Sequence, residues 1–314
     1  MSTEPADFPT MDRELLAALP ALPHIDFRDL RTARTVLEAA AADQLARLPD
    51  LEKRWGVRIE QSRAPGEVPF LLFQPPPGPT AVPALMWVHG GGFAVGAAAL
   101  EAEFCAELSA RAKAVVAVPD YRLAPEHPFP AALDDCYATL RSLHDGAARV
   151  DTERLAVGGQ SAGGGLAAAT ALLARDRGEI GVQHLVLESP ELDDRLTTHS
   201  MKTFTTTPVW TRAAAELSWA HYLGSDRDEV PPYAVPARAE TLAGLPPTYI
   251  GLAELDPLRD EGLDFARRLL HSGVSVELHL FPGTFHRSST VPAAVSRRSR
   301  TEIIETVARR LRTR

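Results

Sequence analysis

Apolar positions along the chain follow one pattern before residue 55 and another after residue 81. Residues 11–55 are rich in alanine and leucine and place apolar residues three and four positions apart, which predicts helices. Asp29 stands where it would cap the second of these helices. The zone between the two patterns is polar and contains the run PPPGP at 75–79, which is typical of a turn or loop.

From residue 81 onward, short apolar runs alternate with segments of helical periodicity. The apolar runs cover residues 84–88, 114–121, 154–159, 184–189, 247–255 and 276–281. The helical patterns cover residues 104–112, 130–144, 163–177 and 261–273. Buried strands that alternate with helices predict an α/β fold, with a mostly parallel sheet covered by helices on both faces. The alternation breaks at about 195–235, where aromatic residues and prolines predict an insertion.

Composition and charge narrow the class of protein. The chain has 314 residues, of which 45% are hydrophobic and 24% charged, which is typical of a globular protein and excludes wholesale disorder. A chain of this size can bury a core without disulfides or metals. The net charge of −8 argues against nucleic acid or an anionic membrane surface as the main partner.

Two cysteines, Cys105 and Cys136, are too few for a disulfide framework, and both lie in helical patterns where they are expected to be buried. No run of 18 apolar residues predicts a membrane span, and the first residues lack the basic start and apolar core of a secretory signal. No histidine and cysteine spacing suggests a metal site. We therefore expect a cytoplasmic protein that needs neither a metal nor an organic cofactor.

A serine lies in the run Gly159-Gln160-Ser161-Ala162-Gly163, between an apolar strand and an apolar helix. A sharp strand-to-helix turn exposes a serine hydroxyl, and glycines on either side avoid collisions at such a turn. The helix that follows favours developing negative charge at its N-terminus. Ser161 is thus a candidate nucleophile; the alternative is a glycine-rich turn whose serine has no chemical role.

The run His89-Gly90-Gly91-Gly92-Phe93 directly follows the first predicted strand. Three glycines let the backbone approach a ligand closely with N–H groups free to donate, as an oxyanion hole requires. A flexible loop or a phosphate cradle are the alternatives. The two common phosphate-loop motifs are absent, which weakens the second of these.

In this fold a nucleophilic serine is followed along the chain by an acid and then by a histidine. His271 falls in a helical pattern and His279 within a predicted strand, whereas His286 falls in the loop after the last strand. Only a loop at the carboxyl end of a strand places an imidazole over the serine, so His286 is the predicted base.

The predicted acid is Asp256, which ends an apolar run and lies 286 − 256 = 30 residues before the predicted base. That separation accommodates one helix and one strand, so both residues reach the same edge of the sheet. Glu254 is a competitor, while Asp260 and Glu261 look like acids at the start of the next helix.

Taken together, these motifs resemble the hormone-sensitive-lipase-like family of α/β-hydrolase carboxylesterases, bacterial branch. The resemblance covers nearly the whole chain and rests on HGGGF (89–93), DYRLAPEHPFPAAL (120–133), GGQSAGG (158–164), DPLRDEG (256–262) and FPGTFH (281–286). The resemblance implies an α/β-hydrolase fold in a single domain, residues 1–314, with a helical cap made from about 1–55 and 195–235.

The resemblance also implies roles for individual residues. Ser161, Asp256 and His286 would form the catalytic triad, and the amides of Gly91, Gly92 and Ala162 would form the oxyanion hole. The run DYRLAPE would be architectural rather than catalytic.

Two positions depart from the family pattern. Gln160 stands where the family often has aspartate, and Arg287 stands where it often has glycine. A guanidinium beside His286 would disfavour the protonated imidazole. Alternatively, Arg287 points to solvent or binds a substrate carboxylate.

These features predict a serine carboxylesterase that acts on a small-molecule ester with a short to medium acyl chain. Four aromatic residues of the cap either line the substrate pocket or pack within the cap: Phe204, Trp210, Trp219 and Tyr222. The same acyl chemistry also suits an amidase, a carbamate hydrolase or a deacetylase of a natural product. A non-catalytic small-molecule receptor on this fold is a further alternative. The family resemblance also implies a homodimer formed through an edge strand.

Overall fold

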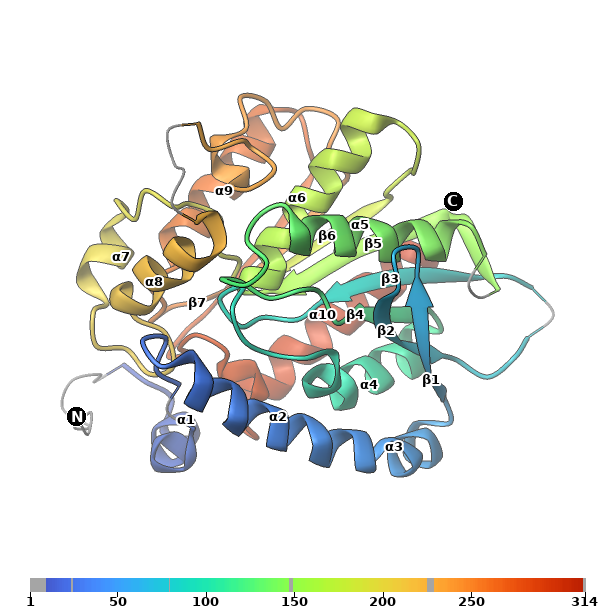
Figure 1. Cartoon of the computed structure of the whole chain (residues 1–314), viewed down its shortest axis with the longest axis horizontal. Coiled ribbons are helices and arrows are strands. Elements are labelled where there is room, and N and C mark those ends of the chain that lie inside the picture. Colours follow the sequence, from blue (N-terminus) through green and yellow to red (C-terminus); the bar gives the residue numbers. More distant parts are fainter. Residues whose placement is uncertain (1–9, 24, 79, 147–148, 225–228, 313–314) are drawn as a thin grey trace.

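A computed structural model describes residues 10–23, 25–78, 80–146, 149–224 and 229–312 of the chain. Within these residues the centre of the molecule is an eight-stranded sheet in the order β1-β2-β4-β3-β5-β6-β7-β8 (Figure 1). The strands are β1 (Arg58–Ala64), β2 (Val68–Gln74), β3 (Val82–Val88), β4 (Val115–Pro119), β5 (Val150–Gln160), β6 (His184–Glu188), β7 (Thr248–Ala253) and β8 (Val276–Phe281).

The strands from β4 to β8 in this order pair in parallel, as the alternation of apolar runs and helical patterns predicted. The predicted α/β-hydrolase fold class is confirmed. The first two strands differ from the sequence prediction, which placed only a loop between the helices of residues 11–55 and residue 81. β1 pairs with β2, and β2 with β4, in antiparallel fashion. β1 is an edge strand with a polar sequence, RIEQSRA, so it lacks the apolar run that marks the buried strands.

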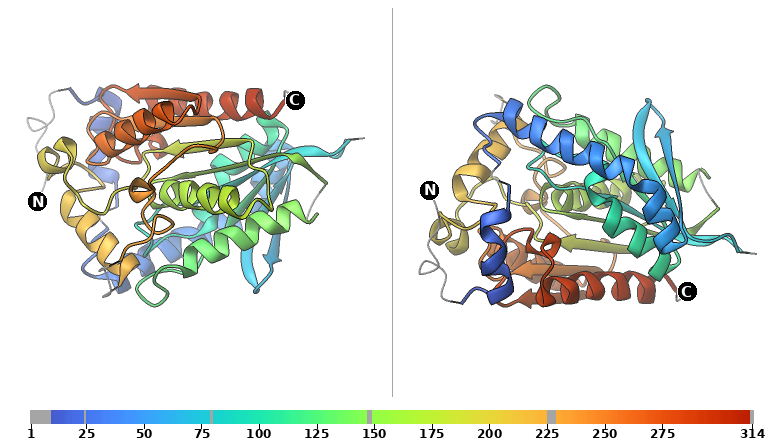
Figure 2. Two further views of the ribbon diagram at one scale, coloured as in Figure 1. Left: turned by 90° about the horizontal axis from the view of Figure 1, so that it is seen from above. Right: turned by 90° about the horizontal axis from the view of Figure 1, so that it is seen from below.

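Helices cover both faces of the sheet (Figure 2). Alternate residues of β3 divide between two cores: Ala84 and Met86 pack on one face, Leu85 and Trp87 on the other. The first core contains α5 (Ala131–His144), α6 (Ala162–Arg177) and α9 (Arg259–His271). The second contains α3 (Leu48–Trp55), α4 (Ala102–Ala112) and α10 (Ala294–Arg312).

All the remaining helices except α2 lie beyond the carboxyl ends of the parallel strands, and α2 runs from there along the molecule to α3 (Figure 1). They are α1 (Arg13–Ala18), α2 (Leu30–Ala46), α7 (His199–Thr203) and α8 (Arg212–Leu223). Asp29 caps α2 as predicted, since its carboxylate accepts the Thr32 N–H at 3.1 Å. The segments predicted as a cap, 1–55 and 195–235, include residues 1–9, 24 and 225–228, which lie outside the described residues.

Arg34 of α2 ties this N-terminal helix to the core. Its guanidinium makes two 2.7 Å bonds to Glu126, and it also donates to the carbonyls of Ala94 and Ala124 at 3.0 and 2.8 Å. The guanidinium lowers the pKa of the Glu126 carboxyl to about 2. Glu126 belongs to the DYRLAPE run, so this part of the run is indeed architectural.

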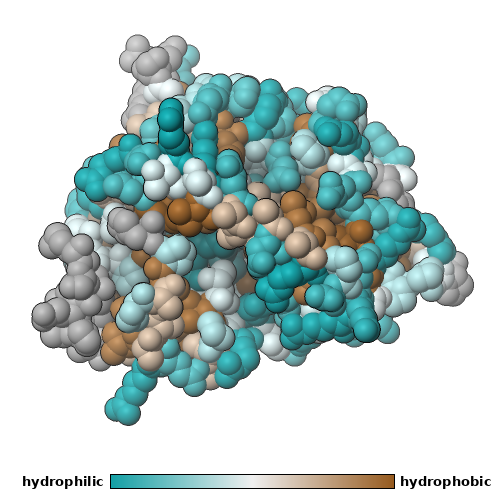
Figure 3. Space-filling view, turned by 60° about the horizontal axis from the view of Figure 1, so that its bottom comes forward, coloured by the Kyte–Doolittle hydropathy of each residue, from teal (hydrophilic) through white to brown (hydrophobic). Residues whose placement is uncertain are grey.

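The face drawn in Figure 3 is largely hydrophilic, with apolar side chains gathered across its middle. Among the described helices, none combines the length and the apolar character needed to cross a lipid bilayer. Cys105 and Cys136 are buried and are not joined in a disulfide.

Candidate active site

Ser161 occupies a sharp turn between β5, which ends at Gln160, and α6, which begins at Ala162. Its backbone has φ 58° and ψ −127°, a sparsely populated conformation for a residue with a side chain. A Cβ at Gly159 would lie 2.3 Å from the Gly163 carbonyl oxygen, and one at Gly163 would lie 2.1 Å from that of Val88. Both glycines are therefore required by close backbone contacts, as the motif predicted.

The structure brings Ser161, His286 and Asp256 together in one chain of hydrogen bonds. His286 Nε2 lies 2.8 Å from Ser161 Oγ, and His286 Nδ1 lies 2.7 Å from Asp256 Oδ2. Because the carboxylate only accepts, the imidazole donates from Nδ1, and Nε2 is left to accept the serine proton. The three side chains are at most 1% exposed.

Loops after β7 and β8 position the acid and the base. The second oxygen of Asp256 accepts the Leu258 N–H at 2.9 Å, which fixes the carboxylate. Glu254, the competing acid, accepts the Gly283 N–H at 2.7 Å instead. Glu254 thus holds the loop that carries His286.

The other two histidine candidates lie elsewhere. His271 ends α9, and His279 on β8 pairs with Glu302 at 2.6 Å.

The glycine loop packs against the turn that carries Ser161. A Cβ at Gly90 would lie 3.1 Å from the Ser161 Cβ. Gly91 has φ 132°, and Gly92 has φ 53°. Neither glycine N–H donates to another described residue. The N–H of Ala162, the first residue of α6, has no partner within the helix. These three backbone N–H groups thus have no hydrogen-bond partner among the described residues.

His89 and Tyr121 hold the start of this loop, a role that sequence analysis missed. The rings stack 4.2 Å apart, and the Tyr121 hydroxyl donates to the His89 carbonyl at 3.0 Å. Burial lowers the pKa of His89, so the imidazole is neutral and donates from Nδ1 to the Gly90 carbonyl at 2.8 Å. Tyr121 belongs to the DYRLAPE run, which is the signal that points to it.

Arg287 forms an ion pair within the protein, which sequence analysis did not consider. Its guanidinium is 25% exposed and pairs with the buried Glu101 at 3.4 Å. Trp87 Nε1 donates to the same Glu101 carboxylate at 3.3 Å. Gln160, the other departure from the family pattern, donates to Ser289 Oγ at 3.0 Å.

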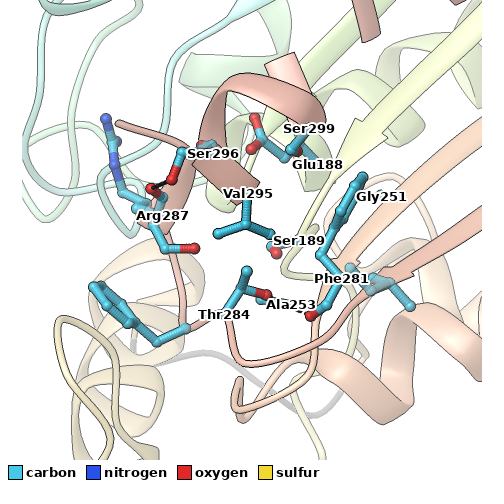
Figure 4. Close-up of a pocket in the computed structure, with 14 residues that line it drawn as sticks. Glu188, Ser189, Gly251, Ala253, Phe281, Thr284, Arg287, Val295, Ser296 and Ser299 are labelled. Carbon is cyan, nitrogen blue, oxygen red and sulfur yellow. Dashed lines mark hydrogen bonds between the residues drawn. The ribbon is translucent and has the colours of Figure 1, made fainter. Parts of the chain in front are cut away.

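A small cavity lies beside the loop that carries Arg287 (Figure 4). Its volume is about 20 Å³, which suits one water molecule rather than an ester. Glu188 lines it, and burial raises the pKa of this carboxyl. The cavity is therefore too small to hold the substrate ester.

The four aromatic residues of the predicted pocket lie at different places. Trp210 is nearest to the triad, with its ring centroid 5.5 Å from that of His286. Trp219 and Tyr222 pack against Phe93, at 5.3 and 3.9 Å between ring centroids. Phe204 lies under the Arg259 guanidinium, at 5.1 Å.

Phe27 lies over the site together with Trp210. Its ring meets Trp210 edge-on at 5.1 Å, and its Cε1 lies 2.6 Å from the position of a Cβ at Gly92. Sequence analysis did not single out Phe27, because the segment around it carries no motif. In the part of the chain that the structure describes, no group of three or more histidine, cysteine or acidic side chains is arranged to hold a metal ion.

Comparison with known proteins places the chain among esterases. Residues 85–289 match the model of a family described as having the α/β hydrolase fold. The carboxylesterase NlhH of Mycobacterium tuberculosis is 37% identical over 238 residues, which cover 73% of this chain and 74% of NlhH. The esterase LipI of the same species is 36% identical over 75% of this chain and 76% of its own length.

Comparison with solved structures also finds esterases. The structure of a bacterial heroin esterase superposes with a TM-score of 0.92 at 48% sequence identity, covering 98% of this chain and all of that one. The esterase LipW of Mycobacterium marinum superposes with a TM-score of 0.88 at 36% identity, covering 98% of each chain. The chain therefore belongs to the α/β-hydrolase fold family, in its hormone-sensitive-lipase-like branch of carboxylesterases.

Proposed function

We propose that the protein is a serine carboxylesterase for short- to medium-chain esters, with Ser161 as nucleophile, His286 as general base and Asp256 as the acid that orients it. The observation that carries this proposal is the pair of hydrogen bonds, 2.8 and 2.7 Å long, that joins the three side chains. The named carboxylesterase relatives support the choice of an ester as the substrate.

In the proposed mechanism, Ser161 Oγ attacks the ester carbonyl carbon while His286 Nε2 removes the hydroxyl proton. The imidazolium gives this proton to the departing alcohol, which leaves an acyl-enzyme. Water then attacks the acyl group with His286 again as base, and the acid is released. Asp256 stabilises the imidazolium through its bond to Nδ1 and does not itself take the proton.

The amides of Gly91, Gly92 and Ala162 are the proposed oxyanion hole. Their position beside Ser161 and their lack of other described partners support this role. Donors already fixed by the fold need no reorganisation when the carbonyl oxygen becomes negative, which makes this kind of stabilisation large.

The proposed cap consists of the N-terminal helices and the segment 195–235. Trp210 is the best supported member of the substrate pocket, because its ring lies against His286. Phe204, Trp219 and Tyr222 remain proposed pocket residues. The close cover over Ser161, which leaves it 1% exposed, supports a preference for short acyl chains.

The test is hydrolysis of p-nitrophenyl acetate, butyrate, octanoate and palmitate by the wild type and by Ser161→Ala. We expect activity that peaks on the short chains and falls by about 10⁴- to 10⁶-fold in the variant. Activity that survives in Ser161→Ala overturns the assignment of the nucleophile. A folded wild type that cleaves none of these esters but cleaves a matched amide is an amidase, and one that binds esters without turnover is a receptor.

Dimerisation through the edge of the sheet is also proposed. β8 is the last strand of the sheet, and its Leu278 and Leu280 side chains are 42% and 46% exposed. Light scattering of Leu280→Lys, with the exposed Leu270→Lys on α9 as control, tests this edge. A monomeric wild type overturns the proposal.

We propose the cytoplasm as the location, supported by two buried cysteines that form no disulfide. Cell fractionation tests it, and recovery of the protein outside the cytoplasm overturns it.

A further inference from the structure

Glu191 is a buried carboxyl that the proposed mechanism does not use. It lies three residues after the end of β6, and its side chain is 0% exposed. Neither of its carboxylate oxygens has a hydrogen-bond partner among the described residues. A buried polar group without a partner is costly, and an unoccupied ligand site is one reason for a protein to keep one.

The backbone of Glu191 is fixed to the nucleophile turn. Its N–H donates to the Ser161 carbonyl at 3.0 Å. Its own carbonyl oxygen lies 2.2 Å from the position that a Cβ would take at Gly165, in the first turn of α6. The backbone of Glu191 is therefore in direct contact with the turn that carries the reacting serine.

A second unpartnered polar group, Ser218 Oγ, approaches from the cap. Ser218 belongs to α8, is 0% exposed and has no hydrogen-bond partner among the described side chains and backbone groups. Its Oγ lies 3.0 Å from the position of a Cβ at Gly92, which is the side of the proposed oxyanion hole. Ser218 and Glu191 are too far apart for an ordinary hydrogen bond, but the Ser218 hydroxyl is close enough to lower the pKa of the Glu191 carboxyl. The two groups thus connect the nucleophile turn with the glycine loop.

The charged groups that act on Glu191 are acidic. Burial raises the pKa of Glu191 to about 8, the Ser218 hydroxyl opposes this rise, and the Asp256 carboxylate adds to it. Glu261 on α9 is the other nearby acid, and it is held by the backbone N–H of Leu192 at 2.6 Å. No arginine or lysine is among the groups that shift Glu191. The surroundings of Glu191 therefore favour the binding of a cation.

The apolar surroundings suit an organic cation. Phe93 Cζ lies 3.7 Å from the position of a Cβ at Gly165, close to the Glu191 backbone. Trp219, which follows Ser218 on α8, packs against the same Phe93 ring. An ammonium group flanked by aromatic rings gains from cation–π attraction as well as from a carboxylate.

We propose that Glu191, supported by Ser218, is a specificity-determining residue that binds a protonated amine carried by the ester substrate. The proposal rests on the proposed esterase function and names its substrate class. When the amine binds, its N–H donates to the Glu191 carboxylate, and a carboxyl that was protonated releases its proton to water. No covalent bond is made or broken in this step.

The test uses two pairs of esters that have the same shape and differ in charge. On the alcohol side, 2-(dimethylamino)ethyl acetate is compared with 3-methylbutyl acetate. On the acyl side, methyl 3-(dimethylamino)propanoate is compared with methyl 4-methylpentanoate. The readout is the ratio of kcat/KM for the charged ester to that for the neutral one. We expect a ratio of about 10 to 100 in one of the pairs, as hydrogen bonds to charged groups give.

Glu191→Gln keeps the shape of the side chain and removes the ionisable group. We expect this variant to bring the ratio close to 1, and Ser218→Ala to lower it by a smaller factor. Glu188→Gln is the matched control, because it removes a buried carboxyl whose neighbours, Ser289 and Arg287, differ from those of Glu191, and it should keep the wild-type ratio. A wild-type ratio near 1 in both pairs, or an unchanged ratio in Glu191→Gln, overturns the proposal.

The ratio should also depend on pH. With the pKa of Glu191 raised to about 8 by burial, the free carboxyl is mostly protonated at pH 6, so the charged ester must displace a proton to bind. The ratio is therefore expected to rise from pH 6 to pH 8 in the wild type, by up to about tenfold per unit. The protonation of His286 affects the hydrolysis of both esters equally, so it cancels from the ratio. A ratio that is flat with pH while still lost in Glu191→Gln contradicts the proton release.

A binding measurement separates failure of the inference from failure of the esterase function. Calorimetry of Ser161→Ala with each ester needs no turnover. Tighter binding of the charged ester than of its neutral partner supports Glu191 as the amine site even if the wild type hydrolyses neither. Hydrolysis of the neutral esters with equal binding of both overturns only the inference.

Discussion

The two sides of the active site are built in different ways. On one side is the frame, which we define as the glycine loop and the nucleophile turn, residues 89–92 and 159–165. On the other is the cover, which we define as Phe27, Trp210 and Ser218. In the frame, a Cβ at Gly91 would meet the Val95 carbonyl oxygen at 1.9 Å, so backbone contacts backbone. On the side of the cover, a Cβ at Gly92 would meet the side chains of Phe27 and Ser218, at 2.6 and 3.0 Å.

The polar groups differ in the same way. In the frame, the side chains of His89 and Ser161 both have hydrogen-bond partners fixed by the fold. In the cover, Trp210 Nε1 and Ser218 Oγ are buried and have no partner among the described residues. Because backbone contacts hold the frame in place, we expect the frame to position the reacting groups. We expect the unpartnered side-chain groups of the cover to determine which substrates bind.

The largest expected effect comes from replacing Gly91 or Gly92 by alanine. The two variants should lose different amounts of activity, because one Cβ would meet the frame and the other the cover. Gly91→Ala drives a Cβ into backbone and must displace the loop, so we expect kcat to fall by about 10²- to 10³-fold, the range for a lost oxyanion donor. Gly92→Ala meets the movable Phe27 ring, so we expect a change mainly in KM and a fall in kcat of less than about tenfold.

The measurement is steady-state kinetics on p-nitrophenyl butyrate, together with thermal unfolding to check that each variant folds. Equal losses of kcat in the two variants contradict the distinction between frame and cover at this loop.

Removing Arg34 should loosen α2, the helix that follows Phe27 of the cover, from the core, with an intermediate effect. Arg34→Met loses the bonds to Glu126, Ala94 and Ala124, and we expect it to lower the free energy of unfolding by about 1–2 kcal/mol and to raise KM. Arg31→Met, on the exposed face of the same helix, is the control and should change neither quantity. An unchanged KM in Arg34→Met shows that the cover is positioned without this residue.

The smallest expected effect concerns Arg287. Because its guanidinium is paired with Glu101, Arg287→Gly removes a cation and leaves an unpaired carboxylate near the triad. We expect the acidic limb of the kcat/KM profile to move to higher pH by about half a unit. The double variant Arg287→Gly/Glu101→Gln should return to the wild-type profile. A double variant that stays shifted indicates that the guanidinium acts on His286 by itself.

Much of the frame was predictable from the sequence, since its elements are local. Glycines around Ser161 and after the first predicted strand mark turns that only glycine tolerates, and the apolar runs locate the strands that end there. Asp256 and His286 followed from the rule that the carboxyl ends of parallel strands share one edge.

The cover was much less predictable, because its contacts join residues far apart in the chain. Arg34 bonds to Ala94, 60 residues away, and no local pattern records that pairing. Glu191 stands in the acidic run ELDDR, which is typical of a solvated loop, yet the fold buries it completely. Strand β1 was missed for a related reason, since an edge strand does not need an apolar sequence.

The first turn of α6 sets a limit on how this enzyme can be altered. A side chain at Gly163 would strike the Val88 carbonyl, and one at Gly165 would strike the Glu191 carbonyl at 2.2 Å. We therefore expect almost no substitution of these glycines to be tolerated. Along α8 we expect more substitutions to be tolerated, because its contacts are made by side chains. Directed evolution toward new substrates then has its useful diversity in α8 and the segment before it, and a library that randomises the glycines yields mostly misfolded protein.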